Sequence, residues 1–197
     1  MTHPLVTDLL AIALSYLIGS VPTGLWLGLR LRGIDIREHG SKNIGATNTM
    51  RVLGKPLGAL ALAGDMGKGM IAVLLFARLG TWEHLPLACG IAAVVGHTTS
   101  IFLRFRGGKG VATGAGVFLA LCPIPTLIAA GVFAVVVALT RMVSAGSISA
   151  SVALCAALYL SDSPWLLRLI ATAVAILIIW KHRSNISRIL RGAENRI

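Results

Sequence analysis

A segment in the N-terminal part of the chain combines the residue types that bind an oxyanion. Between Gly40 and Arg51 it contains glycines, small hydroxyl side chains, amides and positive charges. Glycine lets backbone N–H groups turn toward an anion, Ser, Thr and Asn donate from their side chains, and Lys and Arg supply charge. The composition favours binding of a phosphate or similar oxyanion over a flexible polar linker. The candidate ligands here are Ser41, Asn43, Gly45, Thr47, Asn48 and Arg51.

A second segment, Arg104–Thr113, places glycines around a lysine directly before an apolar run. The run predicts a helix that starts close to the lysine, and the N–H groups at the start of a helix attract anions. The segment does not match the GxxxxGK[ST] pattern, so hydrolysis of ATP or GTP is not supported. A basic turn that contacts lipid headgroups is the alternative interpretation. The candidate ligands are Gly107, Gly108, Lys109, Gly110 and Thr113.

Two smaller polar groups occur in the C-terminal half of the chain. Ser144 and Ser147 follow a basic residue, and they would either donate to an anion or cap the helix that begins there. His182 and Asn185 are three residues apart and would share one face of a helix. An ordinary basic tail explains this second pair equally well.

Three polar residues interrupt the apolar part of the sequence itself. Asp65 and Lys68 are also three residues apart, and charges inside a membrane span are costly and usually paired or functional. A structural ion pair, or a pair close to a cavity, is favoured over direct catalysis. His97 lies shortly before the second glycine-rich segment, and it either lines a cavity or is a core histidine bonded to a neighbouring hydroxyl.

The elements that position these residues must be membrane helices. The chain of 197 residues is 56% hydrophobic and 13% charged, with a mean hydropathy of +0.84. A soluble domain has about a quarter of its residues charged, so this sequence cannot build a water-facing surface. The net charge of +11 therefore indicates basic cytoplasmic loops in the first place, and nucleic-acid binding is not expected.

The apolar runs predict an all-α integral membrane protein of seven helices, forming a single catalytic domain over residues 1–197. The run from Gly110 to Thr140 is divided because two prolines interrupt it and because the basic residues at both ends should face one side. With the N-terminus outside and the C-terminus in the cytoplasm, 15 of the 18 Lys and Arg residues lie on the cytoplasmic side. Several helices are short for a span, which needs about 20 residues. The predicted spans are roughly 5–30, 56–78, 85–103, 110–122, 125–140, 147–160 and 164–181.

One further pattern is interpreted as chance. His3 and Asp8 fit H-x4-D, the His/Asp pattern of a large class of acyltransferases, but two fixed positions are weak evidence. In the predicted topology they lie across the membrane from the glycine-rich segments. No cluster of residues has metal-ligand spacing, so neither a metal nor another cofactor is expected.

The polar segments together resemble the PlsY family, the integral membrane glycerol-3-phosphate acyltransferases that use acyl phosphate. The resemblance lies in Gly40-Ser41-x-Asn43-x-Gly45-Ala46-Thr47-Asn48 with Arg51, in Gly107–Thr113, and in Ser144 with Ser147. The hydrophobic pattern extends it over nearly the whole chain, and Lys42 stands where a small residue is more usual. The resemblance implies seven helices, an outside N-terminus and an active site on the cytoplasmic side of a bacterial inner membrane.

The resemblance also implies a reaction, in which acyl phosphate and glycerol 3-phosphate give 1-acylglycerol 3-phosphate (lysophosphatidic acid) and phosphate, the first acylation of phospholipid synthesis. Backbone amides near Gly45, Thr47 and Ser144 would hold the phosphate of the donor. Asn43 and Thr113 would support the loops, and membrane lipid is the other expected partner. The residues that would grip glycerol 3-phosphate and the transferred group are Ser41, Arg51, Lys109, His182 and Asn185.

The residues favour direct attack by the substrate hydroxyl, because no Ser-His-Asp set is evident. By the resemblance the base is the substrate's own phosphate, and otherwise His182 or Asp65 would have to serve. The main alternative function is a transporter or channel for an anionic phosphorylated metabolite. Transporters often contain repeats with matched broken helices, and here one proline-broken pair has no counterpart.

Overall fold

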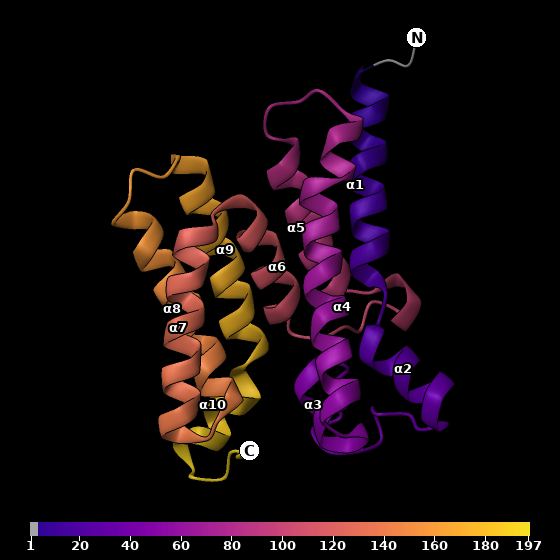
Figure 1. Ribbon diagram of the computed structural model, residues 1–197, viewed down its shortest axis with the longest axis vertical. Coiled ribbons are helices and arrows are strands. Elements are labelled where there is room, and N and C mark those ends of the chain that lie inside the picture. The colour runs from indigo at the N-terminus through magenta and orange to yellow at the C-terminus, as the bar shows by residue number, and fades with distance from the viewer. Residues whose placement is uncertain (1–3) are drawn as a thin grey trace. The chain divides into compact units, whose positions relative to one another are not determined.

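The computed structural model describes residues 4–197, and in that range the chain consists of helices and loops with no β-strand (Figure 1). The all-α prediction is confirmed. The chain divides after Leu121 into two compact units, an N-terminal and a C-terminal one. Each unit is described by itself.

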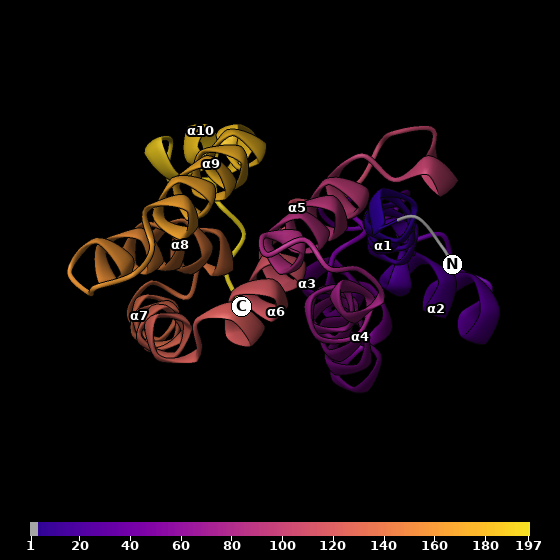
Figure 2. The same cartoon turned by 90° about the horizontal axis from the view of Figure 1, so that it is seen from above.

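The N-terminal unit is built on three long helices: α1 (Pro4–Ser20), α4 (Lys55–Leu74) and α5 (Leu85–Thr98). Figure 2 shows them nearly end-on, with α1 packed against both α4 and α5. The core between them is made of small side chains, Ala11, Ala72, Cys89 and Ala93, together with Leu85. Small residues let helix backbones approach closely in a membrane, where burial of apolar surface alone gives no drive to associate.

Shorter helices complete this unit and carry the polar segments. They are α2 (Thr23–Arg32), α3 (Ala46–Leu53), η1 (Phe76–Leu79), η2 (Ile101–Leu103) and α6 (Val111–Leu121). The predicted first span is broken into α1 and α2, which are bent by 47° at the Val21–Pro22 break. Proline has no N–H to donate and so interrupts a helix. The first basic segment, expected as a loop, contains the two turns of α3.

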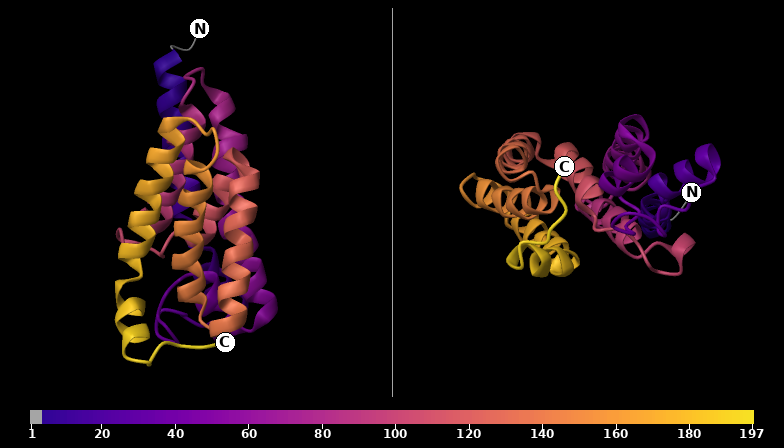
Figure 3. Two further views of the ribbon diagram at one scale, coloured as in Figure 1. Left: turned by 90° about the vertical axis from the view of Figure 1, so that its left-hand side faces the viewer. Right: turned by 90° about the horizontal axis from the view of Figure 1, so that it is seen from below.

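The C-terminal unit consists of α7 (Pro123–Thr140), α8 (Val143–Tyr159), α9 (Trp165–Lys181) and α10 (Arg183–Leu190). Figure 3 (left) shows α7, α8 and α9 lying along one another, in agreement with their packing. The predicted division of residues 110–140 is confirmed, because α6 ends at Leu121 and α7 begins at Pro123. Proline fits the first turn of a helix, where its missing N–H would have no partner.

Length and apolar composition give three helices that could cross a membrane alone: Lys55–Leu79, Leu85–Leu103 and Pro123–Thr140. The bent pairs α1 with α2 and α9 with α10 raise the number to five, and α6 and α8 are shorter apolar helices. Along α7, large apolar side chains such as Leu127, Ile128, Val135 and Leu139 are exposed, as expected for a surface that faces lipid. The count of seven spans and their orientation remain predictions.

Substitutions at two glycines of α4 test how closely α4 packs on α6. A Cβ atom at Gly69 would lie 2.3 Å from the Thr113 carbonyl oxygen, whereas one at Gly67 would meet nothing within 4 Å. We expect Gly69→Ala to destabilise the protein by about 1–3 kcal/mol, because α6 must move away. The matched Gly67→Ala should stabilise it by about 0.5–1 kcal/mol, because alanine favours the helix. Thermal unfolding in detergent measures both, and equal effects would contradict the packing.

Candidate functional site

The first glycine-rich segment is folded around the buried side chain of Asn48. Its Oδ1 accepts a hydrogen bond from the Ser41 N–H at 2.8 Å, and its Nδ2 donates to the carbonyls of Ile36 at 2.8 Å and His39 at 3.2 Å. Gly40 has φ +58°, and a Cβ there would lie 2.4 Å from Asn48 Oδ1. Asn48 therefore stabilises the loop, because its amide oxygen and nitrogen both hydrogen-bond to the backbone of the loop.

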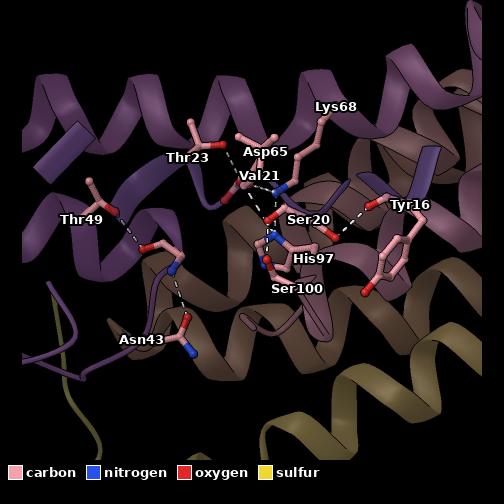
Figure 4. Close-up of polar contacts among 11 residues, drawn as sticks. Tyr16, Ser20, Val21, Thr23, Asn43, Thr49, Asp65, Lys68, His97 and Ser100 are labelled. Carbon is pink, nitrogen blue, oxygen red and sulfur yellow. Dashed lines mark hydrogen bonds and ion pairs between the residues drawn. The ribbon is translucent and has the colours of Figure 1, made fainter. Parts of the chain in front are cut away.

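The same segment ends in the N-terminus of α3. Asn43 Oδ1 accepts from the Gly45 N–H at 3.0 Å, and the Gly45 carbonyl accepts from Thr49 Oγ1 at 3.2 Å (Figure 4). Gly45 is the N-cap residue in an extended conformation, and it has no side chain to cap the helix. The first N–H groups of α3, including that of Thr47, lie at the positive end of the helix, where anions bind favourably. The Asn43 side chain therefore fixes the backbone at Gly45, directly before α3.

Ser41 and Arg51 lie on the exposed side of this loop. The stem of Arg51 passes the turn at Gly40, since a Cβ there would lie 3.4 Å from Arg51 Cδ. The backbone of the Ser41 turn and the Arg51 side chain are therefore neighbours. The segment thus supplies a hydroxyl, a guanidinium and the N-terminus of α3, which are the types of donor that a phosphate group needs, with Arg51 in the last turn of that helix.

The second glycine-rich segment lies directly on the end of α5. The Gly108 N–H donates to the His97 carbonyl oxygen at 3.0 Å. A Cβ at Gly107 would lie 2.1 Å from that oxygen, and a Cβ at Gly108 would lie 2.2 Å from His97 Nε2. Gly110 has φ +83°, which turns the chain into α6. The glycines are therefore needed for close approach and for the turn, and they present Lys109 just before a helix N-terminus.

Thr113, in the first turn of α6, carries an unusual polar atom. Within residues 4–197, its Oγ1 is the one buried side-chain oxygen or nitrogen that has no hydrogen-bond partner. An unsatisfied buried hydroxyl costs about 1–3 kcal/mol and calls for an explanation. A ligand donor or acceptor at the N-terminus of α6 would supply one, in keeping with an anion site at Lys109.

Asp65, Lys68 and His97 form a buried cluster below the two loops. Lys68 Nζ lies 2.9 Å from Asp65 Oδ1, 2.9 Å from His97 Nδ1 and 2.8 Å from the Val21 carbonyl oxygen (Figure 4). The ion pair expected between Asp65 and Lys68 is present. Asp65 also accepts from Thr23 Oγ1 at 3.0 Å, so the carboxylate bridges α4 and α2.

Two of the predicted residues of the C-terminal unit, Ser144 and Asn185, meet at a glutamate that sequence reasoning missed. Glu194 Oε1 accepts from Asn185 Nδ2 at 2.6 Å and from Ser144 Oγ at 2.8 Å, and Oε2 accepts from Arg188 Nε at 2.7 Å. Burial raises the pKa of Glu194, but these three hydrogen bonds and the charge of Arg188 together bring it below its ordinary value. The sequence did contain a signal for Glu194, since it is the one carboxylate in a segment rich in arginine and lies two residues after Gly192.

The side chains of His182 and Ser147 hydrogen-bond to backbone carbonyls one helical turn before them. His182 is buried where α9 meets α10, and its Nδ1 donates to the Ile178 carbonyl oxygen at 2.8 Å. Ser147 donates to the Val143 carbonyl oxygen at 2.9 Å. The alternative that Ser144 and Ser147 cap a helix is wrong, because α8 begins after Met142 and both serines lie inside it. His182 and Asn185 both turn their side chains to the buried side.

The candidate residues therefore form two groups, one in each unit. The C-terminal unit holds Ser144, Ser147, His182 and Asn185, and all the others belong to the N-terminal unit. His3 lies outside the described residues. Asp8 Oδ1 accepts from the backbone N–H groups of Thr81 at 2.9 Å and Trp82 at 3.4 Å, so it organises a turn.

The contacts of Glu194 predict acid sensitivity of the C-terminal unit. A carboxylate whose pKa is lowered on folding stabilises the fold above its unfolded pKa, and this is lost as the pH falls through the folded pKa. Glu194→Gln should therefore lower the thermal midpoint at neutral pH and lose part of the decline seen on acidification below about pH 5, where a glutamate of the unfolded chain begins to gain its proton. The exposed Glu83 gives the control, Glu83→Gln. An unchanged acid profile in Glu194→Gln would contradict the role of this carboxylate.

Comparison with known proteins identifies the family to which this chain belongs. The family model described as glycerol-3-phosphate acyltransferase matches residues 9–192. Proteins named glycerol-3-phosphate acyltransferase from Geobacter metallireducens and Desulforudis audaxviator are 50% and 47% identical to this chain. The first match covers 98% of both chains, and the second covers 95% of this chain and 94% of its relative.

Two solved structures are similar over nearly the whole length. Both are crystal structures of PlsY, an integral membrane glycerol 3-phosphate acyltransferase, one in its glycerol 3-phosphate form and one in its lysophosphatidic acid form. The TM-scores are 0.91 and 0.88, the identities 37% and 36%, and each match covers 96% of this chain and 95% of the other. The resemblance noted in the sequence is thereby confirmed, and the chain belongs to the glycerol-3-phosphate acyltransferase family.

Proposed function

We propose that the acyl donor of this enzyme is an acyl phosphate, and that the loops around Arg51 and Lys109 hold the two phosphates of the substrate pair. The observation that carries this proposal is the doubling of one arrangement within the N-terminal unit. Each loop combines glycines and basic residues with the N-terminus of a helix, α3 in the first case and α6 in the second. Two phosphate-bearing substrates account for two such loops.

The reaction then needs little beyond positioning. The oxygen of the 1-hydroxyl of glycerol 3-phosphate attacks the acyl carbon, the bond from that carbon to the phosphate oxygen breaks, and inorganic phosphate leaves. Phosphate is a good leaving group, so orientation and stabilisation of the developing negative charge supply most of the rate. Ser41, Arg51 and Lys109 would contribute donors and charge.

The hydroxyl proton must pass to a base. Asp65 is a poor candidate, because its carboxylate is 1% exposed and already bound to Lys68 and Thr23. The phosphate of glycerol 3-phosphate is the base that we propose, because it is brought to the reacting hydroxyl with the substrate itself.

We place the active site on the cytoplasmic side of a bacterial inner membrane. The support for this orientation is the excess of Lys and Arg in the predicted cytoplasmic segments, which hold 15 of 18 such residues. A transporter of anionic metabolites is not favoured, since the relatives named above are acyltransferases.

The donor is tested by reconstituting the purified protein with glycerol 3-phosphate and either palmitoyl phosphate or palmitoyl-CoA. We expect lysophosphatidic acid and inorganic phosphate from palmitoyl phosphate and no product from palmitoyl-CoA, because the second loop would hold a phosphate leaving group. Product is followed by thin-layer chromatography and by phosphate release. Turnover with palmitoyl-CoA alone would overturn the assignment of the donor.

The two cations are tested by Arg51→Ala and Lys109→Ala. Each should lower kcat/KM by about 100-fold or more, since a removed donor to a developing oxyanion typically costs that much. Lys55→Ala is the matched control, because Lys55 is an exposed cation four residues after Arg51 and outside the proposed contacts. A loss of similar size in Lys55→Ala would show that general surface charge is responsible.

A further inference from the structure

The buried cluster of Asp65, Lys68 and His97 is not used by the proposed chemistry, yet it contains two charged residues at the depth of the apolar helices. The side chains are 2% exposed for Asp65 and 4% for Lys68, and 4% for His97. A buried ion pair adds little stability compared with well-packed apolar residues, so stability alone does not explain its presence. Its contacts with the loops suggest another role.

Lys68 donates to a backbone carbonyl at the break between two helices. The chain breaks between α1 and α2, and the Val21 carbonyl there accepts from Lys68 Nζ at 2.8 Å. The neighbouring Ser20 carbonyl accepts from Ser100 Oγ at 2.5 Å. In a membrane such groups must find partners within the protein. The cluster thereby fixes α2, which begins at Thr23, against α4.

Lys68 also sets the proton position on His97. An ammonium group only donates, so His97 Nδ1, 2.9 Å away, must accept. A neutral imidazole then carries its proton on Nε2. That nitrogen is the atom against which Gly108 packs, and the adjacent residue is Lys109. The ring is therefore a rigid support between Lys68 and the second loop.

On its other side the cluster reaches the first loop. Asp65 Oδ1 accepts from Thr23 Oγ1, and the next residue, Gly24, packs on that loop. A Cβ at Gly24 would lie 2.2 Å from Thr49 Oγ1 and 2.6 Å from the Ile44 carbonyl oxygen. Figure 4 shows Thr23, Asp65, Lys68 and His97 in one continuous group, with Asn43 and Thr49 of the first loop beside it.

We propose that the Asp65–Lys68–His97 cluster is a positioning device for acyl transfer, which fixes the spacing between the loop of Arg51 and the loop of Lys109. It acts through Thr23 and Gly24 on one side and through His97 and Gly108 on the other. The proposal rests on the assigned roles of Arg51 and Lys109. In this proposal Asp65, Lys68 and His97 touch no substrate. They affect only the geometry in which the two substrates meet.

Four variants and one control test this role. Lys68→Met removes the ammonium group but keeps the apolar stem, and Asp65→Asn/Lys68→Met removes both charges in case an unpaired Asp65 prevents folding. His97→Gln retains an amide near the place of Nε2, whereas His97→Asn retains one near Nδ1. Ser15→Ala is the control, because Ser15 is also fully buried and polar, and its hydroxyl donates to the Ala11 carbonyl oxygen of its own helix.

For each variant we would measure kcat, KM for glycerol 3-phosphate and the thermal midpoint in detergent. We expect kcat to fall about 10- to 100-fold in Lys68→Met, in the double variant and in His97→Asn, because a displacement of about 1 Å can have such an effect. His97→Gln should keep at least about ten times the kcat of His97→Asn, since it preserves the contact with Gly108. Ser15→Ala should keep its kcat even if its thermal midpoint falls.

Nitrogen-15 NMR of histidine-labelled protein gives a second, independent readout. The resonances lost in His97→Gln belong to His97, and in the unmodified protein they should report an Nε2–H tautomer with an accepting Nδ1. Lys68→Met should shift the Nδ1 signal. A protonated Nδ1 in the unmodified protein would overturn the arrangement.

The outcomes separate the two levels of the argument. If Arg51→Ala and Lys109→Ala retain full activity, the assignment of the phosphate loops fails. If they lose activity while the cluster variants keep the kcat of the unmodified enzyme, only the positioning role fails. If kcat follows the thermal midpoint in every variant, Ser15→Ala included, the cluster is merely structural and the proposal is wrong.

Discussion

Backbone groups that leave a helix inside a membrane must be hydrogen-bonded by the protein, and the N-terminal unit is arranged around one such break. The α1–α2 break frees the carbonyls of Ser20 and Val21, which are satisfied by Ser100 and Lys68. A lysine at that depth needs an anion, which Asp65 supplies, and its third proton is accepted by His97. One interruption of a helix thus accounts for a series of buried polar residues, because each of them supplies a hydrogen bond or a charge that its neighbour needs.

The same break brings the glycine-rich loops within reach of the helices. It redirects α2 so that Gly24 packs on the first loop, and His97 provides the surface on which the second loop lies. Loops that bind anions carry many backbone N–H groups and are difficult to keep at membrane depth without water. Here protein groups hydrogen-bond to the backbone of both loops. The Asn48 side chain bonds to the first loop, and the His97 carbonyl bonds to the second.

Much of this could be read from the sequence, and the failures have physical causes. The prolines after Cys122 correctly indicated two helices, because proline ends one helix and begins another at a known place. Pro22 carried the same signal but lay inside a run long enough to span the membrane, so the bend between α1 and α2 was missed. The helix α3 was missed because it lies in a basic segment, where hydropathy indicates only that the segment is outside the membrane. The spacing of His182 and Asn185 did indicate helical structure in the region of α10.

The candidate site shows the same division. The residue types of the two loops indicated phosphate, since that chemistry depends on composition and short spacing. The tasks of individual residues depend on tertiary contacts, so Asn48 was expected as a ligand although its amide is used by the loop. Glu194 was overlooked because its three partners, Ser144, Asn185 and Arg188, come together only when the chain is folded.

The contact between His97 and Gly108 limits how this sequence can change over time. Any side chain at position 108 would occupy the place of the imidazole, so it would require a smaller residue at position 97. A smaller residue there would leave one donor of Lys68 unsatisfied and would in turn disfavour the charge on Asp65. Substitutions at these four positions should therefore be strongly non-additive, and an evolutionary path through single changes would pass through poorly folded intermediates. We therefore expect these four residues to be kept together or replaced together in evolution.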